Sequence, residues 1–298
     1  QFSLGQAGFM AVGAYVVGVF TVPVDLRPNV FYAVPMNPMI ADIQLPLWLA
    51  LLFGGLLAAL IAFLIGWPVL RLRGDYLAIA TLGFSEIIRI LITNAQSWTN
   101  GALGIKDIPA LNDVRYIFVA TAITFLFVTC LINSSYGRAF KAIREDEIAA
   151  EAMGVGLFKH KCMAFMLSAF FAGIGGGLYA TLLGTVDPKN FLFTLTYNFL
   201  LIIVLGGMGS ITGSMLGSII VTGGLEYLRV FDEPLELFGM AIPLFRPGFR
   251  MVMFSVLLMA CVLFWRKGIM GTNEFTWDKF IAFCKNPVKY FTQKGANQ

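Results

Sequence analysis

Residues 47–65 read LWLALLFGGLLAALIAFLI, and this apolar run without a charged side chain decides the fold class. A helix needs about 20 mostly apolar residues to cross a bilayer, and residues 249–265 form a second run of similar length. A transmembrane β-barrel would instead show short segments of alternating polarity. The continuous runs therefore predict an all-α protein that lies in a membrane.

The composition of the whole chain agrees with a membrane setting. Of the 298 residues, 58% are hydrophobic and 13% are charged, whereas soluble domains carry about 25% charged residues. The chain has too few polar side chains to cover a soluble surface, so membrane lipid is its expected surrounding. The net charge of +4 is small and the basic residues form no single face, so we expect no nucleic-acid partner.

About eight membrane-embedded segments follow from the apolar runs, which makes the predicted fold a polytopic helical protein with some short or broken segments. The sixth and seventh are short and are joined by GGMGS at residues 206–210, which indicates a tight turn or a re-entrant break. Irregular backbone at membrane depth is tolerated only where protein or a wet cavity covers it. The predicted segments are 4–20, 46–66, 76–93, 116–132, 162–183, 195–207, 211–228 and 249–265.

Lysine and arginine divide unequally between the two alternating sets of loops. One set, which includes the loop 133–161 and the C-terminal end of the chain, carries thirteen of them, and the other set carries seven. Cytoplasmic segments are enriched in these residues. We therefore place loop 133–161 and the C-terminus in the cytoplasm, with a transmembrane domain over residues 1–271 and a cytoplasmic tail over 272–298.

The residue patterns of common catalytic and metal sites are absent from the sequence. There is no Gly-Lys dipeptide, and so no phosphate-binding loop of the G-x-x-x-x-G-K-[ST] type. His160 is the only histidine and the four cysteines are scattered singly, which argues against a metal site or a redox dithiol. We predict that the chain is not an enzyme, has no catalytic residues, and itself binds no metal or cofactor.

Two charged residues lie inside a predicted membrane segment, where an unpaired charge costs at least about 2.5 kcal/mol. Glu86 and Arg89 are three residues apart, so they share a helix face and can pair. The pair is either a structural ion pair or part of the polar lining of a solute path, for which Thr81 and Ser85 are further candidates. The sequence has no chain of acidic residues or histidines for a proton relay, which argues against an ion-coupled secondary transporter without excluding sodium coupling.

Residues 137–154 read GRAFKAIREDEIAAEAMG, an alanine-rich stretch that predicts a helix over 138–153 ending at Gly154. Phe140, Ile143 and Ile148 give this helix a partial apolar face. Such a helix can offer side chains to a groove on a soluble partner. The alternative is a solvated connector with mixed charges.

Glycines recur inside three of the predicted segments, where small residues let helix backbones approach closely. They predict tight helix packing and, in the functional reading, a helix interface that rocks during transport. These glycines are Gly5, Gly8, Gly13, Gly18, Gly173, Gly175, Gly176, Gly177, Gly213, Gly217, Gly223 and Gly224.

Five blocks of this sequence resemble the permease subunits of bacterial branched-chain amino acid ABC importers, in particular the second of their two paired permeases. The blocks run in the family's order and span nearly the whole chain. They are SLGQAGFM at 3–10, LRLRGDYLAIATLGFSEIIRIL at 70–91, the stretch 137–154, SAFFAG at 168–173 and VLGGMGS at 204–210.

The resemblance implies a translocation subunit for branched-chain or other hydrophobic amino acids in a bacterial inner membrane. It implies pairing with a second homologous permease, two cytoplasmic subunits that bind ATP-Mg, and an extracytoplasmic solute-binding protein. Relatives of the family carry urea or short amides, so these solutes stay an alternative, as does a self-contained ion-coupled transporter.

The residue patterns and the resemblance together give two sets of candidate site residues, and the resemblance itself implies Arg138, Arg144, Glu147, Ala150 and Gly154 of the first set. In the loop 133–161, the residues expected to contact the ATPase are Arg138, Lys141, Arg144, Glu147, Ala150, Glu151 and Gly154. The candidates for the translocation path are Thr81, Ser85, Glu86, Arg89, Gly206, Gly207 and Gly209.

Three features depart from the family pattern. Asn100 stands where the first glycine of a Thr-Gly-Gly motif is usual, and Arg266 is followed by Lys267 instead of proline. The chain also begins where family members already have an upstream helix, so we expect the domain over 1–271 to be N-terminally incomplete.

Overall fold

The computed structural model describes residues 3–72, 74–110 and 114–228, and further along residues 236–237, 240–241, 252–253, 255–256, 259, 263 and 268–271. The chain divides into two units, Gln1–Tyr197 and Asn198–Gln298. The elements are α1 (Gln6–Thr21), η1 (Val24–Leu26), α2 (Arg27–Val30), α3 (Pro38–Ala41), α4 (Leu47–Val69), α5 (Asp75–Asn94), α6 (Gln96–Thr99), η2 (Gly101–Leu103), α7 (Arg115–Asn133), α8 (Ser135–Glu145), α9 (Glu147–Ala152), α10 (Leu157–Leu183), η3 (Pro188–Phe191), α11 (Phe193–Gly206), α12 (Ile211–Tyr227), β1 (Glu236–Leu237) and β2 (Met240–Ala241).

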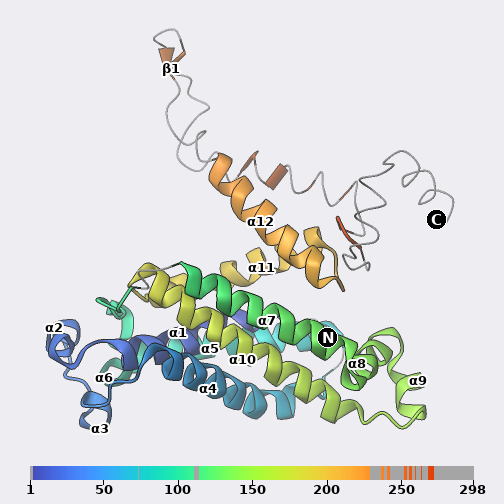
Figure 1. Ribbon diagram of the computed structural model, residues 1–298, viewed down its shortest axis with the longest axis horizontal. Coiled ribbons are helices and arrows are strands. Elements are labelled where there is room, and N and C mark those ends of the chain that lie inside the picture. Colours follow the sequence, from blue (N-terminus) through green and yellow to red (C-terminus); the bar gives the residue numbers. More distant parts are fainter. Residues whose placement is uncertain are drawn as a thin grey trace. The chain divides into compact units, whose positions relative to one another are not determined.

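The first unit is a helical bundle in which α1, α4, α5, α7 and α10 run side by side (Figure 1). The short helices α2, α3 and α6 lie at one end of this bundle, and α8 and α9 lie at the other. Within the described residues, α4, α5, α7 and α10 are the four helices long and apolar enough to cross a membrane alone. The all-α polytopic prediction is thereby confirmed.

Two further spans are possible if bent helix pairs are counted. Gln6–Thr21 and Val24–Val30 meet at 98°, and Phe193–Gly206 and Ile211–Tyr227 meet at 119°, so the described chain has up to six spans. The break predicted at residues 206–210 is therefore confirmed. The first seven predicted segments coincide with α1, α4, α5, α7, α10, α11 and α12. The eighth, 249–265, lies largely outside the described residues.

Helix α1 is the centre of the first unit because its small residues let α4, α5 and α10 pack closely around it. A Cβ atom added at Gly13 would overlap the backbone of Gly173, and one at Gly176 would overlap the carbonyl of Met10. One at Gly54 would lie 3.2 Å from the Gly13 carbonyl oxygen. The glycines at these positions therefore set the distance between α1, α4 and α10, as the packing interpretation predicted.

Arg27 organises the loop between α1 and α4. Its guanidinium donates hydrogen bonds to the carbonyls of Val22 (3.2 Å), Ile40 (2.8 Å), Ala41 (2.5 Å) and Ile43 (2.7 Å). The residue is only 3% exposed. A buried charge costs several kcal/mol unless its polar atoms are satisfied, and here the backbone of one loop satisfies them. Arg27 is therefore a structural residue, and no sequence pattern singled it out.

Asn100 connects two loops at the same end of the bundle. Its backbone is left-handed, with φ of 59°, a region in which glycine and asparagine are the usual residues. The side chain is buried and its amide nitrogen donates to the carbonyls of Val30 (2.9 Å) and Gly104 (2.7 Å). Asparagine therefore suits the left-handed backbone at this position, and its side chain adds two hydrogen bonds that a glycine could not make.

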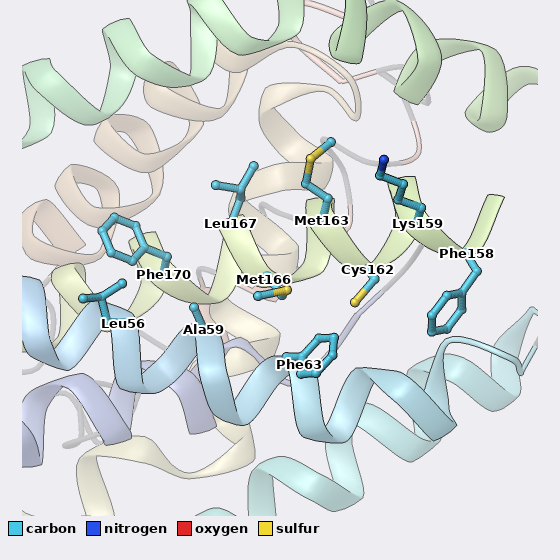
Figure 2. Close-up of a pocket in the computed structure, with 10 residues that line it drawn as sticks. All are labelled: Leu56, Ala59, Phe63, Phe158, Lys159, Cys162, Met163, Met166, Leu167 and Phe170. Carbon is cyan, nitrogen blue, oxygen red and sulfur yellow. The ribbon is translucent and has the colours of Figure 1, made fainter. Parts of the chain in front are cut away.

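An apolar groove of about 570 Å³ lies between the outer faces of α4 and α10 (Figure 2). Leu56, Ala59 and Phe63 form the α4 wall, and residues from Phe158 to Phe170 form the α10 wall. It is open along one side, and its lining is almost wholly apolar.

Candidate functional site

The loop predicted to face a partner protein forms two short helices, α8 and α9. Ser134 caps α8 by accepting a hydrogen bond from the Gly137 amide (3.4 Å). Asp146 is extended, with φ of −154°, and its carboxylate accepts from the Ile148 amide (2.8 Å) and the Ala149 amide (3.0 Å). The prediction of one helix over 138–153 was wrong, because Asp146 ends α8 and acts as the N-cap of α9.

The α8–α9 segment is fixed to the start of α10. The ammonium of Lys161 on α10 contacts the carboxylate of Glu147 on α9 at 2.6 Å. Ile143 and Ala150 are buried beneath the segment. His160 Nδ1 lies 2.8 Å from its own helix's Gly156 carbonyl, and its ring packs beside Phe140. The segment is therefore joined to α10 at two points, by the ion pair from α9 and by the ring contact from α8.

The outward face of this segment carries two nearly free apolar side chains. Ile148 is 80% exposed and Met153 is 85% exposed. Of the predicted apolar face, Ile143 is buried and Phe140 half-buried, so Ile148 alone projects outward. Sequence reasoning missed Met153, although its place just before the helix-ending Gly154 was a usable signal.

The seven predicted ATPase-contact residues divide by exposure. Ala150 is buried and Glu147 is half-buried against Lys161. The five that are exposed are Arg138, Lys141, Arg144, Glu151 and Gly154.

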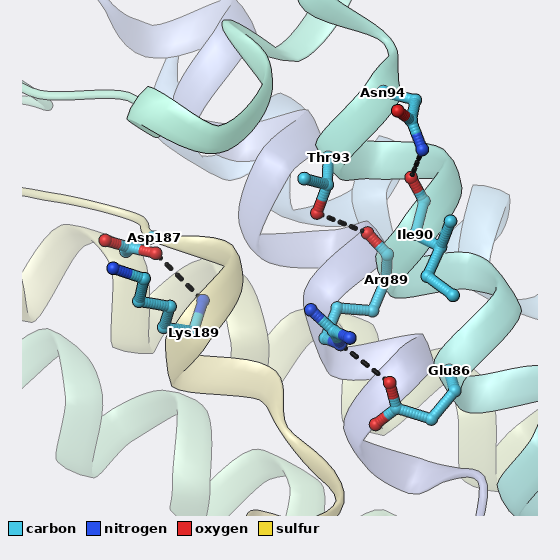
Figure 3. Close-up of polar contacts among 7 residues, drawn as sticks. All are labelled: Glu86, Arg89, Ile90, Thr93, Asn94, Asp187 and Lys189. Carbon is cyan, nitrogen blue, oxygen red and sulfur yellow. Dashed lines mark hydrogen bonds and ion pairs between the residues drawn. The ribbon is translucent and has the colours of Figure 1, made fainter.

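Four residues of the second predicted set lie on α5, where Glu86 and Arg89 form the expected ion pair (Figure 3). Arg89 Nε is 2.7 Å from Glu86 Oε2, and the two side chains are about a quarter exposed, at 25% for Glu86 and 24% for Arg89. The Thr93 hydroxyl donates to the Arg89 carbonyl at 2.8 Å. The other carboxylate oxygen of Glu86 is buried and accepts no hydrogen bond from the described residues.

Thr81 and Ser85 of α5 lie against α1. The Thr81 hydroxyl accepts from the Leu4 amide (3.0 Å) and donates to the Ala78 carbonyl (3.0 Å). Ser85 packs over Gly8, where an added Cβ would be 2.9 Å from the Ser85 Cα. These two candidates are thus buried in a helix contact, whereas Glu86 and Arg89 are partly open.

The glycine candidates form the turn of the second unit. Helix α11 ends at Gly206, and Gly207 and Gly209 have φ of 116° and 106°. Ser210 then caps α12 by accepting from the Gly213 amide at 3.0 Å. The amide of Ile269 donates to the Leu205 carbonyl at 2.8 Å. The chain reversal at this turn therefore needs glycine at positions 207 and 209.

Among the described residues there is no cluster of histidine, cysteine, aspartate or glutamate that could hold a metal ion. The arrangement offers a polar surface with two apolar side chains at one end of a bundle and a partly exposed ion pair on a membrane helix.

Comparison with known proteins identifies a family and several relatives that are similar to this chain. The family model described as branched-chain amino acid transport system / permease component matches residues 1–263. The high-affinity branched-chain amino acid transport system permease protein LivM of Escherichia coli (strain K12) is 36% identical over 264 residues, which cover 77% of this chain and 58% of that protein.

With more distant relatives, the match covers a larger share of the relative's own length. A probable branched-chain amino acid transport permease protein LivM of Methanocaldococcus jannaschii is 27% identical over 292 residues, or 89% of this chain and 83% of that protein. The guanosine ABC transporter permease protein NupQ of Bacillus subtilis is 24% identical over 278 residues, or 86% of this chain and 80% of that protein.

No solved structure matches the chain. The chain spans 58% of the length of the Escherichia coli relative, but the family model covers residues 1–263, which is most of its sequence. The chain therefore belongs to the family of branched-chain amino acid transport system permease components.

Proposed function

We propose that this chain is a membrane-spanning translocation subunit of an ATP-driven importer for branched-chain amino acids. The family match and the names of the LivM relatives, which are branched-chain amino acid transport permeases, support the solute class. The sequence holds no phosphate-binding loop of its own. ATP-Mg would therefore be bound and hydrolysed by two separate subunits, and this chain would be no enzyme.

The observation that carries the proposal is the outward face of α8–α9. Ile148 and Met153 are almost fully exposed although they are apolar, and Arg138, Lys141 and Arg144 of the preceding helix α8 are exposed as well. Apolar anchors with a charged rim are the pattern of a protein contact. The Lys161–Glu147 ion pair then joins this contact to α10.

The excess of lysine and arginine sets the orientation that we propose. The α8–α9 end and the tail 272–298 would face the cytoplasm of a bacterial cell, with the domain 1–271 in the inner membrane. The opposite end, with α2, α3 and α6, would face the extracytoplasmic solute-binding protein. A second homologous permease would complete the pore.

Glu86 and Arg89 are the proposed polar groups of the solute path. A branched-chain amino acid carries an ammonium and a carboxylate on an apolar body, so a site needs few polar groups to hold it. The pair offers one group of each sign, partly exposed on a membrane helix. Thr81 and Ser85 would support α5 against α1, and Gly206, Gly207 and Gly209 would shape the re-entrant turn.

The proposal is tested by reconstitution of the chain with its partner subunits in liposomes. We expect ATP-dependent uptake of radiolabelled leucine. I148D and M153D should each weaken co-purification of the ATPase subunit by roughly 30-fold, because loss of a central contact residue costs about 2 kcal/mol. M39D is the matched control, since Met39 is 77% exposed at the opposite end of the bundle.

Two outcomes would contradict this assignment. Leucine uptake by the purified chain without any ATPase would instead support a self-contained transporter. Transport of guanosine or urea that an excess of leucine does not inhibit would show that the solute is not a branched-chain amino acid. Guanosine is included because of the NupQ relative.

A further inference from the structure

The proposed transport function assigns no role to the groove between α4 and α10, and the length of this groove suggests one. In Figure 2, Leu56 and Phe170 lie toward one end of the row of side chains, and Phe158 and Lys159 lie at the other. Residues 158 and 170 are twelve positions apart on one helix, a distance of about 18 Å along its axis. One leaflet of a bilayer has a hydrocarbon depth of about 15 Å, so the groove spans roughly one leaflet.

The end of the groove at Lys159 has the residues of a membrane–water boundary. The ring of Trp67 packs on that of Phe158, with centroids 5.4 Å apart, and Trp67 is 51% exposed. Amphipathic aromatic rings gather at the headgroup level, and basic side chains beside them attract anionic lipid. Lys159 is exposed, and no carboxylate in the described residues pairs with it.

The lining of the groove does not suit an amino acid, the proposed transported solute. An amino acid would leave its ammonium or its carboxylate unpaired in this groove, because Lys159 is the sole charged side chain that lines it. Methionine and leucine side chains such as Met163, Met166 and Leu167 adapt to an irregular apolar chain. A long hydrocarbon chain with one anionic end fits both features.

We propose that this groove binds an acyl chain of an anionic phospholipid, with the lipid phosphate on the ammonium of Lys159. The binding site is independent of solute transport, so it stands or falls separately from the proposed function. Its expected effect is to retain one anionic lipid on each chain through purification.

Native mass spectrometry of the full chain in a mild detergent tests this site. The protein is mixed with equal amounts of phosphatidylglycerol and the zwitterionic phosphatidylethanolamine. We expect preferential retention of phosphatidylglycerol, and a preference about fivefold smaller in K159Q, since one basic residue at the surface contributes about 1 kcal/mol. A59F fills the groove and should reduce retention of both lipids.

Matched variants separate this site from general lipid contact. K106Q removes an exposed lysine outside the groove, and A122F adds the same bulk on the exposed face of α7. Both should bind lipid as the unmodified chain does. The site is refuted if K159Q keeps the full preference for phosphatidylglycerol or if A59F retains as much lipid as A122F.

A photo-crosslinker identifies the occupant of the groove directly. With benzoylphenylalanine at position 167, illumination of the chain in membranes should add the mass of a phospholipid. Crosslinking to another polypeptide, or to another part of this chain, would show that protein fills the groove and would overturn the proposal.

Discussion

At the scale of single residues, Asn100 and Arg27 hold the loops at the α2–α3 end of the first unit. Each joins chain segments that are separated in sequence, through hydrogen bonds to backbone carbonyls. The left-handed backbone at Asn100 restricts this position to asparagine or glycine, because most other side chains are strained in that conformation.

Replacement of Asn100 separates the backbone effect from the hydrogen bonds. Asn100→Ala should lower the free energy of unfolding by about 2–4 kcal/mol, because it strains the backbone and leaves two carbonyls without a donor. Asn100→Gly should cost less, since it removes only the hydrogen bonds. Thermal unfolding of the detergent-solubilised chain measures both, with exposed Asn94→Ala as the control. Equal losses in Asn100→Ala and Asn94→Ala would contradict this role.

A charge exchange tests whether Glu86 and Arg89 do more than stabilise α5. In the double variant E86R/R89E the ion pair can re-form at the same spacing, so thermal stability should stay close to that of the unmodified chain. Uptake of leucine should fall at least tenfold if the order of charges along the path matters. Full uptake in the exchanged variant would assign the pair to structure alone.

At the scale of elements, a break between α8 and α9 divides the single helix expected over 138–153 into two short helices. The break follows from Asp146, whose side chain satisfies the first amides of α9. It lets α8 follow α7 while α9 is held by Lys161 of α10.

Removal of the Asp146 cap should loosen α9 selectively. Asp146→Ala is expected to cost about 1 kcal/mol, seen as roughly fivefold faster hydrogen exchange in Glu147–Ala152, while exchange in Ser135–Glu145 stays unchanged. Glu145→Ala, at the adjacent exposed position, is the control. Unchanged exchange in α9 would mean that packing and the Lys161 contact hold the helix without the cap.

Two adjacent glycines of α10 give a direct test of close helix packing. A Cβ at Gly176 would overlap the Met10 carbonyl, whereas one at Gly175 would meet nothing within 4 Å. Gly176→Ala should therefore destabilise the bundle by about 1–3 kcal/mol through overpacking. Gly175→Ala should be neutral or slightly stabilising in a thermal unfolding assay. The packing account fails if the two variants unfold at the same temperature.

At the scale of the whole molecule, the positions of Met39 and Met153 at opposite ends of the first unit allow a topology measurement. Both are highly exposed, so each is a suitable labelling site in a chain whose four cysteines are replaced by serine. In intact cells, a membrane-impermeant maleimide should label M39C and should label M153C only after the membrane is permeabilised. Labelling of M153C from outside would reverse the proposed orientation and remove the ATPase contact.

The sequence alone determined the features that depend on short-range patterns. Apolar run lengths predicted the helices, the spacing of Glu86 and Arg89 predicted their pairing, and the glycines at 206–210 predicted the break between α11 and α12. The family also followed from local blocks of sequence.

Only the tertiary structure decided which neighbours each residue meets. It assigned Thr81 and Ser85 to the α1 contact, gave Arg27 its four carbonyl partners, exposed Met153 and formed the groove beside Lys159. Helices α4 and α10 are apolar on the faces they bury and on the faces they expose, so hydrophobic periodicity carries little information about which face packs inward. The fit between particular glycines and backbones on different helices decides it, and that fit exists only once the helices have come together.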